Sequence, residues 1–352
     1  MRNSWLAVAS MGLAWGGAAR AVSFDCAKAA TPQEKAICSS PELGAADDGL
    51  AVAYRAILAA APSDMAAELR FSQVRWVRAR DAQCKVSGAS QMAECLMDQY
   101  QSRTETLQNM IVSVNGLTFV TRSITLKGAA TVGAPHSEER KTEIEQGFGE
   151  VNAKWPQSRG DTPEWRAWNQ EVETAVRMLA SGGCARDERG NCEPVGPWSN
   201  AWVDNMVVDI VATVGFSGLR LVTVSIDDDW DGFGAAHPNY TTMQLNWMLN
   251  EKRELKPGDV FRAGSGWEKF IEARCLVALR TQLGEELGAD WDFAGPLHSV
   301  VLSPENWMLT DSTLTIVFPE YSVSTHADPA DPVSISWDEL KPFMAEGFPV
   351  PR

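Results

Sequence analysis

The chain has 352 residues and a formal net charge of −15 at pH 7, with 46 acidic and 31 basic side chains. This length suggests one large domain or two ordinary ones. Such an acidic chain argues against nucleic acid as a partner, because phosphates are bound mainly by lysine and arginine. The charge would instead attract a basic protein or a cationic ligand, or simply keep the protein in solution.

Residues 1–21 have the pattern of a secretory signal peptide. Arg2 supplies a positive start, an apolar stretch runs from Trp5 to Trp15, and Ala19-Arg20-Ala21 matches a small-x-small cleavage signal. The apolar stretch is too short for a membrane anchor, and the context of Cys26 does not fit a lipoprotein signal. We therefore expect a periplasmic or secreted protein with no transmembrane segment after cleavage.

All seven cysteines lie beyond the signal peptide, where an oxidising compartment would allow disulfides. We expect two disulfides, in any of three pairings, among Cys26, Cys38, Cys84 and Cys95. Cys184 and Cys192 bracket a short polar stretch and suit a bridge that closes a local loop. Cys275 is left over at helical spacing from Ile271 and Leu279, so we expect a buried, unpaired thiol.

The segment 22–112 is predicted to be a small all-α domain. Thr31-Pro32 suits the start of a first helix, because threonine often caps the N-terminus of a helix and proline fits its first turn. An apolar stripe from Leu50 to Ala61 marks a second helix. A third helix is expected from Ser63 to Val86, and a fourth follows the turn at 86–90. Charge here is nearly balanced, with nine basic and eleven acidic side chains.

Four stretches within residues 24–108 carry a family resemblance: FDCAKAATPQEKAIC, LGAADDGLAVAY, QVRWVRARDAQC and ECLMDQYQSRTETL. Together they resemble the N-terminal domain of LprI-type lysozyme inhibitors. The resemblance implies a helical, disulfide-bonded exported module. Within it, Arg80 and Asp81 are expected to form a solvated or helix-packing ion pair, the alternative being a pair that contacts a ligand. Trp76 is expected in the core rather than as a binding platform.

Residues 113–352 carry twenty basic and thirty-five acidic side chains and are predicted to form an α+β domain with a mainly antiparallel sheet. A hinge is expected at residues 113–116. Helices are expected near 137–155, 163–180, 266–283 and 337–343, and strands near 117–126, 206–214, 219–226, 241–249, 307–309, 314–318 and 332–336.

The stretch GAAHPNYTTMQLNWMLNEKRELKPGDVF resembles the signature of the C-terminal domain shared by RsiV-type anti-sigma factors and PdaC-type deacetylases, over about residues 205–345. RsiV-type ectodomains bind lysozyme, so both resemblances imply the same partner. The transmembrane span and the sigma-binding tail of RsiV-type proteins have no counterpart in this sequence. Signalling through a sigma factor is therefore not implied.

The stretch 227–240 is the candidate partner-binding loop, joining two predicted strands. We expect contacts to a partner from Asp227, Asp228, Asp229, Trp230, Asp231, His237, Asn239 and Tyr240, with Trp230 exposed. A calcium site is the weaker alternative. Asp227, Asp229, Asp231 and Gly232 match the first half of an EF-hand loop, but its twelfth position is Pro238 rather than glutamate.

The sequence has no recognisable catalytic constellation, and we predict neither a cofactor nor a metal. Ser265 lies in AGSG, which is not a GxSxG elbow and suits a helix cap. The histidines lack the spacing of a zinc site: His136, His237, His298 and His326.

We therefore predict a non-enzymatic envelope protein that binds or inhibits lysozyme, or binds another basic envelope protein. The main alternative is a module that binds peptidoglycan or another glycan. Eleven tryptophans beyond residue 112 favour it, because indole rings serve as stacking platforms. An uncharacterised hydrolase is a third alternative.

Overall fold

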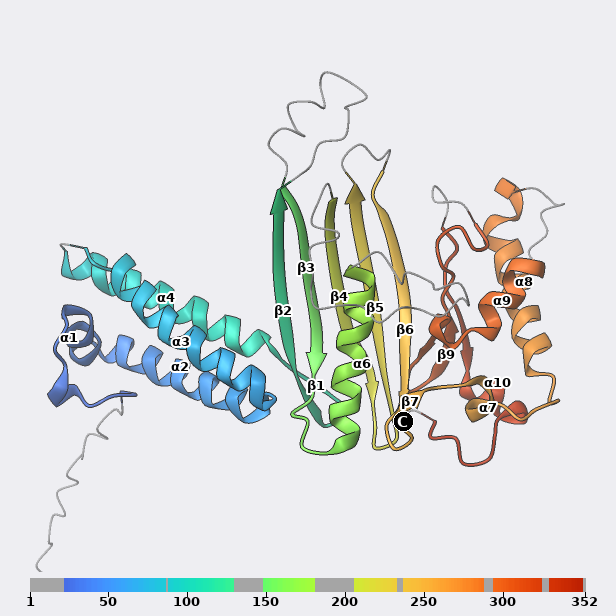
Figure 1. Cartoon of the computed structure of the whole chain (residues 1–352), viewed down its shortest axis with the longest axis horizontal. Coiled ribbons are helices and arrows are strands. Elements are labelled where there is room, and N and C mark those ends of the chain that lie inside the picture. The colour runs from blue at the N-terminus through green and yellow to red at the C-terminus, as the bar shows by residue number, and fades with distance from the viewer. Residues whose placement is uncertain are drawn as a thin grey trace, which may run out of the picture. The chain divides into compact units, whose positions relative to one another are not determined.

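The computed structural model describes residues 22–86, 88–129, 148–180, 206–232, 237–287, 294–324 and 329–350. They form two compact units, the first of residues 22–56 and 70–108, and the second of residues 57–69 and 109–350. Helices build the first unit and sheets with helices the second, so the class is α+β (Figure 1). The predicted signal peptide and the predicted Cys184–Cys192 bridge lie outside the described residues, as do His136 and His326.

The four helices predicted at the N-terminal end are confirmed. They are α1 (Pro32–Ser39), α2 (Pro41–Ala60), α3 (Ser63–Gln83) and α4 (Ala89–Asn109), and the short 3-10 helix η1 (Cys26–Lys28) precedes them. A capping box starts α1, in which the backbone N–H of Glu34 donates to Thr31 Oγ1 (3.1 Å) and that of Thr31 to Glu34 Oε2 (2.9 Å). Leu50, Leu96 and Leu107 are among the buried side chains that hold the helices together.

Both N-terminal disulfides join cysteines that are close in the sequence. Cys26 pairs with Cys38, which ties η1 to α1, and Cys84 pairs with Cys95, which ties the end of α3 to α4. The structure thereby chooses one of the three pairings that the sequence left open. Each bridge closes a short loop and contributes about 3 kcal/mol by restricting the unfolded chain.

A seven-stranded sheet, in the order β1 to β7, lies at the centre of the second unit. Its strands are β1 (Ile111–Val114), β2 (Leu117–Ala129), β3 (Phe148–Gln157), β4 (Met206–Ser217), β5 (Leu221–Gly232), β6 (Asn239–Met248) and β7 (Arg253–Glu254). Neighbouring strands are antiparallel except β3 and β4, which are parallel. Helix α6 (Pro163–Ala180) lies between β3 and β4 in the chain, because parallel neighbours need a long crossover.

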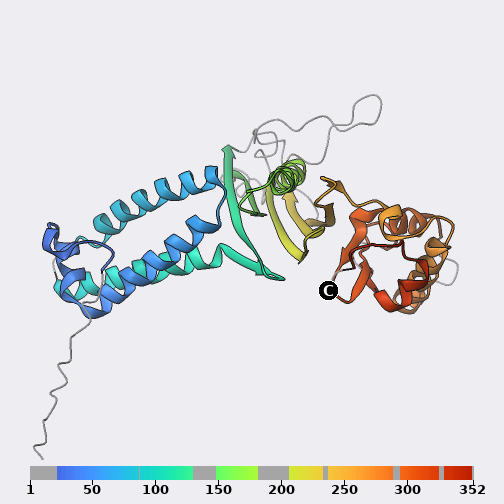
Figure 2. The same cartoon turned by 90° about the horizontal axis from the view of Figure 1, so that it is seen from below.

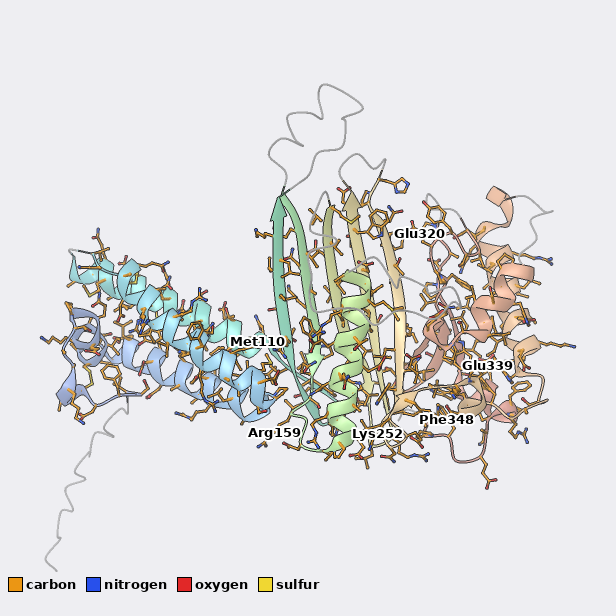
Figure 3. All side chains as sticks on the ribbon, in the orientation of Figure 1. Met110, Arg159, Lys252, Glu320, Glu339 and Phe348 are labelled. Atoms are coloured by element: carbon orange, nitrogen blue, oxygen red, sulfur yellow. A yellow bond between two sulfur atoms is a disulfide. The ribbon has the colours of Figure 1, made fainter. Side chains whose placement is uncertain are left out.

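Helix α6 packs on one face of this sheet, here called the helix face, and Figure 2 shows the helix end-on above the strands. Trp168, Val172 and Val176 of α6 are fully buried there. Their partners are the inward-facing apolar side chains of the sheet, among them Val151, Ala153, Val208, Ile210, Val224 and Ile226. Lys252, on the turn after β6 and labelled in Figure 3, forms an ion pair with Glu164 at the start of α6 (3.5 Å).

Two predictions at the start of this unit are wrong. Residues 148–155, predicted as part of a helix, belong to β3, where Val151, Ala153 and Trp155 alternate with more exposed side chains. Residues 137–147 of that predicted helix lie outside the described residues. The predicted hinge is instead a hairpin turn between β1 and β2. Asn115 and Gly116 have φ angles of 47° and 80°, which suit a two-residue turn.

The remaining elements form a second core on the other face of the sheet. They are α7 (Pro257–Val260), α8 (Trp267–Leu287), α9 (Ala294–Leu302), η2 (Pro304–Asn306), β8 (Trp307–Leu309), β9 (Thr313–Ile316), β10 (Val333–Ser336), α10 (Trp337–Leu340) and η3 (Lys341–Phe343). Phe216 and Met248 of the large sheet belong to this core. Asn246 Nδ2 on β6 donates to the carbonyl oxygens of Pro304 (2.9 Å) and Trp307 (2.7 Å), which fixes the two parts together.

Cys275 lies on α8 as an unpaired and fully buried thiol, as predicted. Burial raises its pKa to about 12, so the thiol stays protonated. Among the described helices, none is both long and apolar enough to cross a membrane.

Candidate functional site

The residues predicted as a partner-binding loop lie largely in two strands. β5 continues to Gly232 and β6 begins at Asn239, so Asp227 to Trp230 form ladder pairs with both neighbouring strands and Asp231 pairs with β4. The loop prediction is wrong for these residues. Aspartate is depleted in strands, yet Val224 and Ile226 begin an inward-facing series that keeps its period of two through the aspartates.

This alternation divides the predicted site between the two faces of the sheet. Asp228 and Trp230 continue the helix face, whereas Asp227, Asp229 and Asp231 are exposed on the opposite face. Trp230 is only partly exposed and packs against the core beneath α6, so its predicted exposure is wrong.

The two strand-end residues follow the same division. Tyr240 is paired with Asp229 and so lies on the exposed face, and Asn239 is paired with Trp230 on the helix face. His237 is exposed just before β6, and its Nδ1 donates to the carbonyl oxygen of Pro238 (2.9 Å). The structure therefore brings together about half of the predicted set.

One face of the sheet carries a group of four aspartates, here called the acidic face: Asp209, Asp227, Asp229 and Asp231. All four side chains are exposed on adjacent strands β4 and β5. Asp209 lies directly opposite Asp229, and such a pair of like charges destabilises a sheet. The sequence prediction missed Asp209, although its position between buried Val208 and Ile210 is the signal that could have found it.

Hydrogen bonds across the strands order part of the acidic face. Thr125 Oγ1 donates to Asn152 Oδ1 (2.8 Å), and Asn152 Nδ2 donates to Asp209 Oδ1 (3.0 Å). Thr242 Oγ1 donates to Asp227 Oδ1 (2.8 Å). The Asp209 and Asp227 carboxylates are thus held in place while remaining open to solvent.

The backbone of β5 does not follow an EF-hand loop. Asp227, Asp229 and Asp231 occupy successive positions on one face of a strand, where side chains stand side by side about 7 Å apart rather than converging. Within the described ranges, no group of three or more histidine, cysteine, aspartate or glutamate side chains is placed to hold a metal ion.

Asp228 is a buried carboxyl group on the helix face. It is 8% exposed, and its Oδ1 has no hydrogen-bond partner. Burial, with a smaller effect of the neighbouring Asp229 charge, raises its pKa to about 6. The ionised form is therefore unfavourable in the folded protein.

A second polar group is buried among the helices of the first unit. Arg80 and Asp81 form the predicted ion pair, in which Nε and Nη2 donate to Asp81 Oδ1 (2.9 and 2.7 Å). Arg80 Nη1 also donates to the Tyr100 hydroxyl (2.8 Å), which donates to Asp47 Oδ1 (2.8 Å). The Arg80 guanidinium lies 5.2 Å from the centre of the Trp76 ring, within the range of a cation–π contact.

These contacts define the Asp47–Tyr100–Arg80 network, in which all three side chains are at least nine-tenths buried. The backbone N–H of Ser23 completes it by donating to Asp47 Oδ2 (2.7 Å). Burial raises the pKa of Tyr100 above its ordinary value, so the hydroxyl remains a donor. Only Arg80 was singled out from the sequence, because the three residues come from separate helices and share no local spacing.

Residues 26–107 match the family model described as "Lysozyme inhibitor LprI". The match contains both disulfides and all three network residues, and it confirms the first resemblance over these residues. A search of curated proteins gave no match.

Two of the solved structures that resemble the chain are DUF3298 family proteins. The protein from Pseudomonas aeruginosa PAO1 is 15% identical, with 66% of this chain and 98% of that chain covered and a TM-score of 0.42. The protein from Bacteroides fragilis NCTC 9343 is 14% identical, with 65% and 94% covered and a TM-score of 0.37. These values support no functional argument, and the resemblance to RsiV-type and PdaC-type proteins stays a prediction.

We predict that Tyr100→Phe destabilises the helical unit by about 2 to 4 kcal/mol, because it removes the hydroxyl that bonds both Asp47 Oδ1 and Arg80 Nη1 in the buried network. The measurement is urea unfolding followed by circular dichroism. The matched control is Tyr54→Phe, which removes a hydroxyl from a less buried tyrosine of α2 and should cost less than about 0.5 kcal/mol. Equal effects of the two changes would contradict the role of the network.

We predict that Asp228→Asn stabilises the second unit at neutral pH. A carboxyl group whose pKa is raised from 3.8 to about 6 on folding favours the folded state most below pH 3.8, and this contribution is lost as pH rises through 6. The gain should therefore be about 1 to 3 kcal/mol at pH 7.5 and close to zero below pH 4. Unfolding free energies measured across this range test it. Asp227→Asn, on the exposed face, should give no comparable pH-dependent gain.

Proposed function

We propose that this chain is an exported, non-enzymatic protein of the cell envelope that binds lysozyme and inhibits its muramidase activity. The observation that carries the proposal is the match of residues 26–107 to the lysozyme-inhibitor family model. The two disulfides support export, because such bridges persist in oxidising compartments. With the signal-peptide pattern of residues 1–21, they favour the periplasm or the extracellular space.

The acidic face is the surface that we propose for contact with a basic lysozyme. Its four exposed carboxylates gather on two adjacent strands, and Tyr240 borders them on β6. We assign Asp227, Asp229, Asp231 and Tyr240 to this contact, with His237 beside them before β6. Asp228, Trp230 and Asn239 lie on the helix face and support the strands from behind.

Charge complementarity of this kind raises the rate of association more than it strengthens the final complex. A complex that depends on it weakens with added salt, because ions screen exposed charges. The acidic face has no catalytic role in this proposal, because the four carboxylates lie on an open sheet surface in contact with water.

The chain from Val22 onward is expected to form a complex with a hen-type lysozyme and to lower its rate of peptidoglycan lysis. Both effects should weaken as ionic strength rises. The measurements are lytic turbidity and titration calorimetry. The absence of a complex at low ionic strength with several lysozyme types would refute the proposal. Retention on insoluble peptidoglycan without lysozyme would favour the glycan-binding alternative.

The double variant Asp227→Asn/Asp229→Asn is expected to slow association with lysozyme by about two- to tenfold at low salt. The control Asp311→Asn/Glu346→Gln removes the same charge from exposed positions in the second core's segments. Stopped-flow or biosensor association rates distinguish the two. If both variants slow association equally, net charge rather than the acidic face directs the encounter.

A further inference from the structure

The helical unit contains a pocket that the lysozyme proposal does not use. Its volume is about 330 Å³, which is in the range of small-molecule sites. Side chains of α2 and α3 supply most of the lining, and Phe24 of the segment before η1 contributes to it. All of these residues belong to the first unit.

The pocket lining combines two acids with two bases. Asp47 and Arg80 are each only 6% exposed, whereas Glu34 is partly exposed and Arg55 is exposed. The lining therefore offers both signs of charge at depth and again nearer to solvent. Such a pocket disfavours ligands that carry a single charge and suits a ligand that carries one of each.

The two buried charged groups of the pocket, Asp47 and Arg80, do not contact each other directly. The Tyr100 hydroxyl lies between Arg80 and Asp47, at 2.8 Å from each, so the two charges form no direct ion pair. A guanidinium has five N–H groups, and the hydrogen bonds of Arg80 to Asp81 and Tyr100 occupy three. Each of the three nitrogens thus makes a hydrogen bond, and two N–H groups of the buried cation remain that a ligand acceptor can use.

Glu34 supplies the matching negative charge at the rim. Its Oε2 accepts from the backbone N–H groups of Ala30 (2.8 Å) and Thr31 (2.9 Å), which fixes the carboxylate in place. These hydrogen bonds, that of Thr31 first, lower the pKa of Glu34, so the group is ionised at neutral pH. Between the charged groups, Trp76, Tyr54 and Leu50 form apolar walls.

We propose that this pocket binds a zwitterionic ligand of the size of an amino acid or a dipeptide. Its carboxylate would be held by Arg80 and Arg55, and its ammonium group by Asp47 and Glu34. An apolar side chain would lie against Trp76 and Tyr54. This binding function is additional to lysozyme inhibition and does not depend on it.

The test is calorimetric titration of the chain from Val22 onward with leucine and with alanyl-alanine. Three matched probes lack one or both charges. N-acetyl-leucine lacks the ammonium group, leucine amide lacks the carboxylate, and N-acetyl-leucine amide lacks both. Zwitterions should bind at least about tenfold more tightly than any of these, as expected for the loss of one charged hydrogen bond. Binding of no zwitterion, or equal binding of a probe with one charge, would overturn the proposal.

Variants at the rim avoid the loss of folding that changes to Arg80 would risk. Arg55→Ala and Glu34→Gln are each expected to weaken leucine binding by about two- to tenfold. Arg78→Ala is the matched control, because Arg78 is exposed on α3 and does not line the pocket. Unchanged binding in both rim variants, or an equal loss in Arg78→Ala, would overturn the site. Asp227→Asn/Asp229→Asn should bind leucine normally, which separates this result from the lysozyme experiment.

Discussion

The second unit depends on the strict alternation of side chains along β5. This strand is hydrogen-bonded on both edges, so its register fixes which residues face α6 and which face solvent. A shift by one residue would move Asp227, Asp229 and Asp231 into the core and Val224 and Ile226 out of it. The same alternation leaves Asp228 buried without a partner for its Oδ1. The open acidic face and the buried carboxyl group on the helix face therefore both follow from the register of β5.

The helical unit is organised by a different principle, the satisfaction of buried polar groups. Tyr100 serves as donor to one charged side chain and as acceptor from another, and both come from neighbouring helices. A purely apolar core would tolerate small displacements of α2 against α3 or α4. Fixed hydrogen-bond directions tolerate them less, so the network defines how these helices pack. It also holds two opposite charges in the lining of the pocket.

Much of the fold could be predicted from local signals. The capping box at Thr31, the apolar stripe from Leu50 and the helix at 163–180 all follow from patterns within one element. The disulfide pairing could not be predicted, because spacing alone does not select among three possibilities. Residues 148–155 were misassigned because Val151 and Trp155, four residues apart, share a face in a helix as well as in a strand, and Ala153 is too small to mark the period of two. Asp209 and Asp47 were missed because their neighbours come from distant parts of the chain.

The hydrogen bond from the Ser23 backbone to Asp47 lies two residues beyond the cleavage point predicted after Ala21. Removal of residues 1–21 would make Val22 the first residue, and the new α-ammonium group would lie one residue from a buried carboxylate. After such a cleavage the first residues would be tied to α2 through the buried Asp47 carboxylate. An affinity tag ahead of Val22 would remove that charge from the neighbourhood of Asp47. Purification tags for this protein belong at the other terminus.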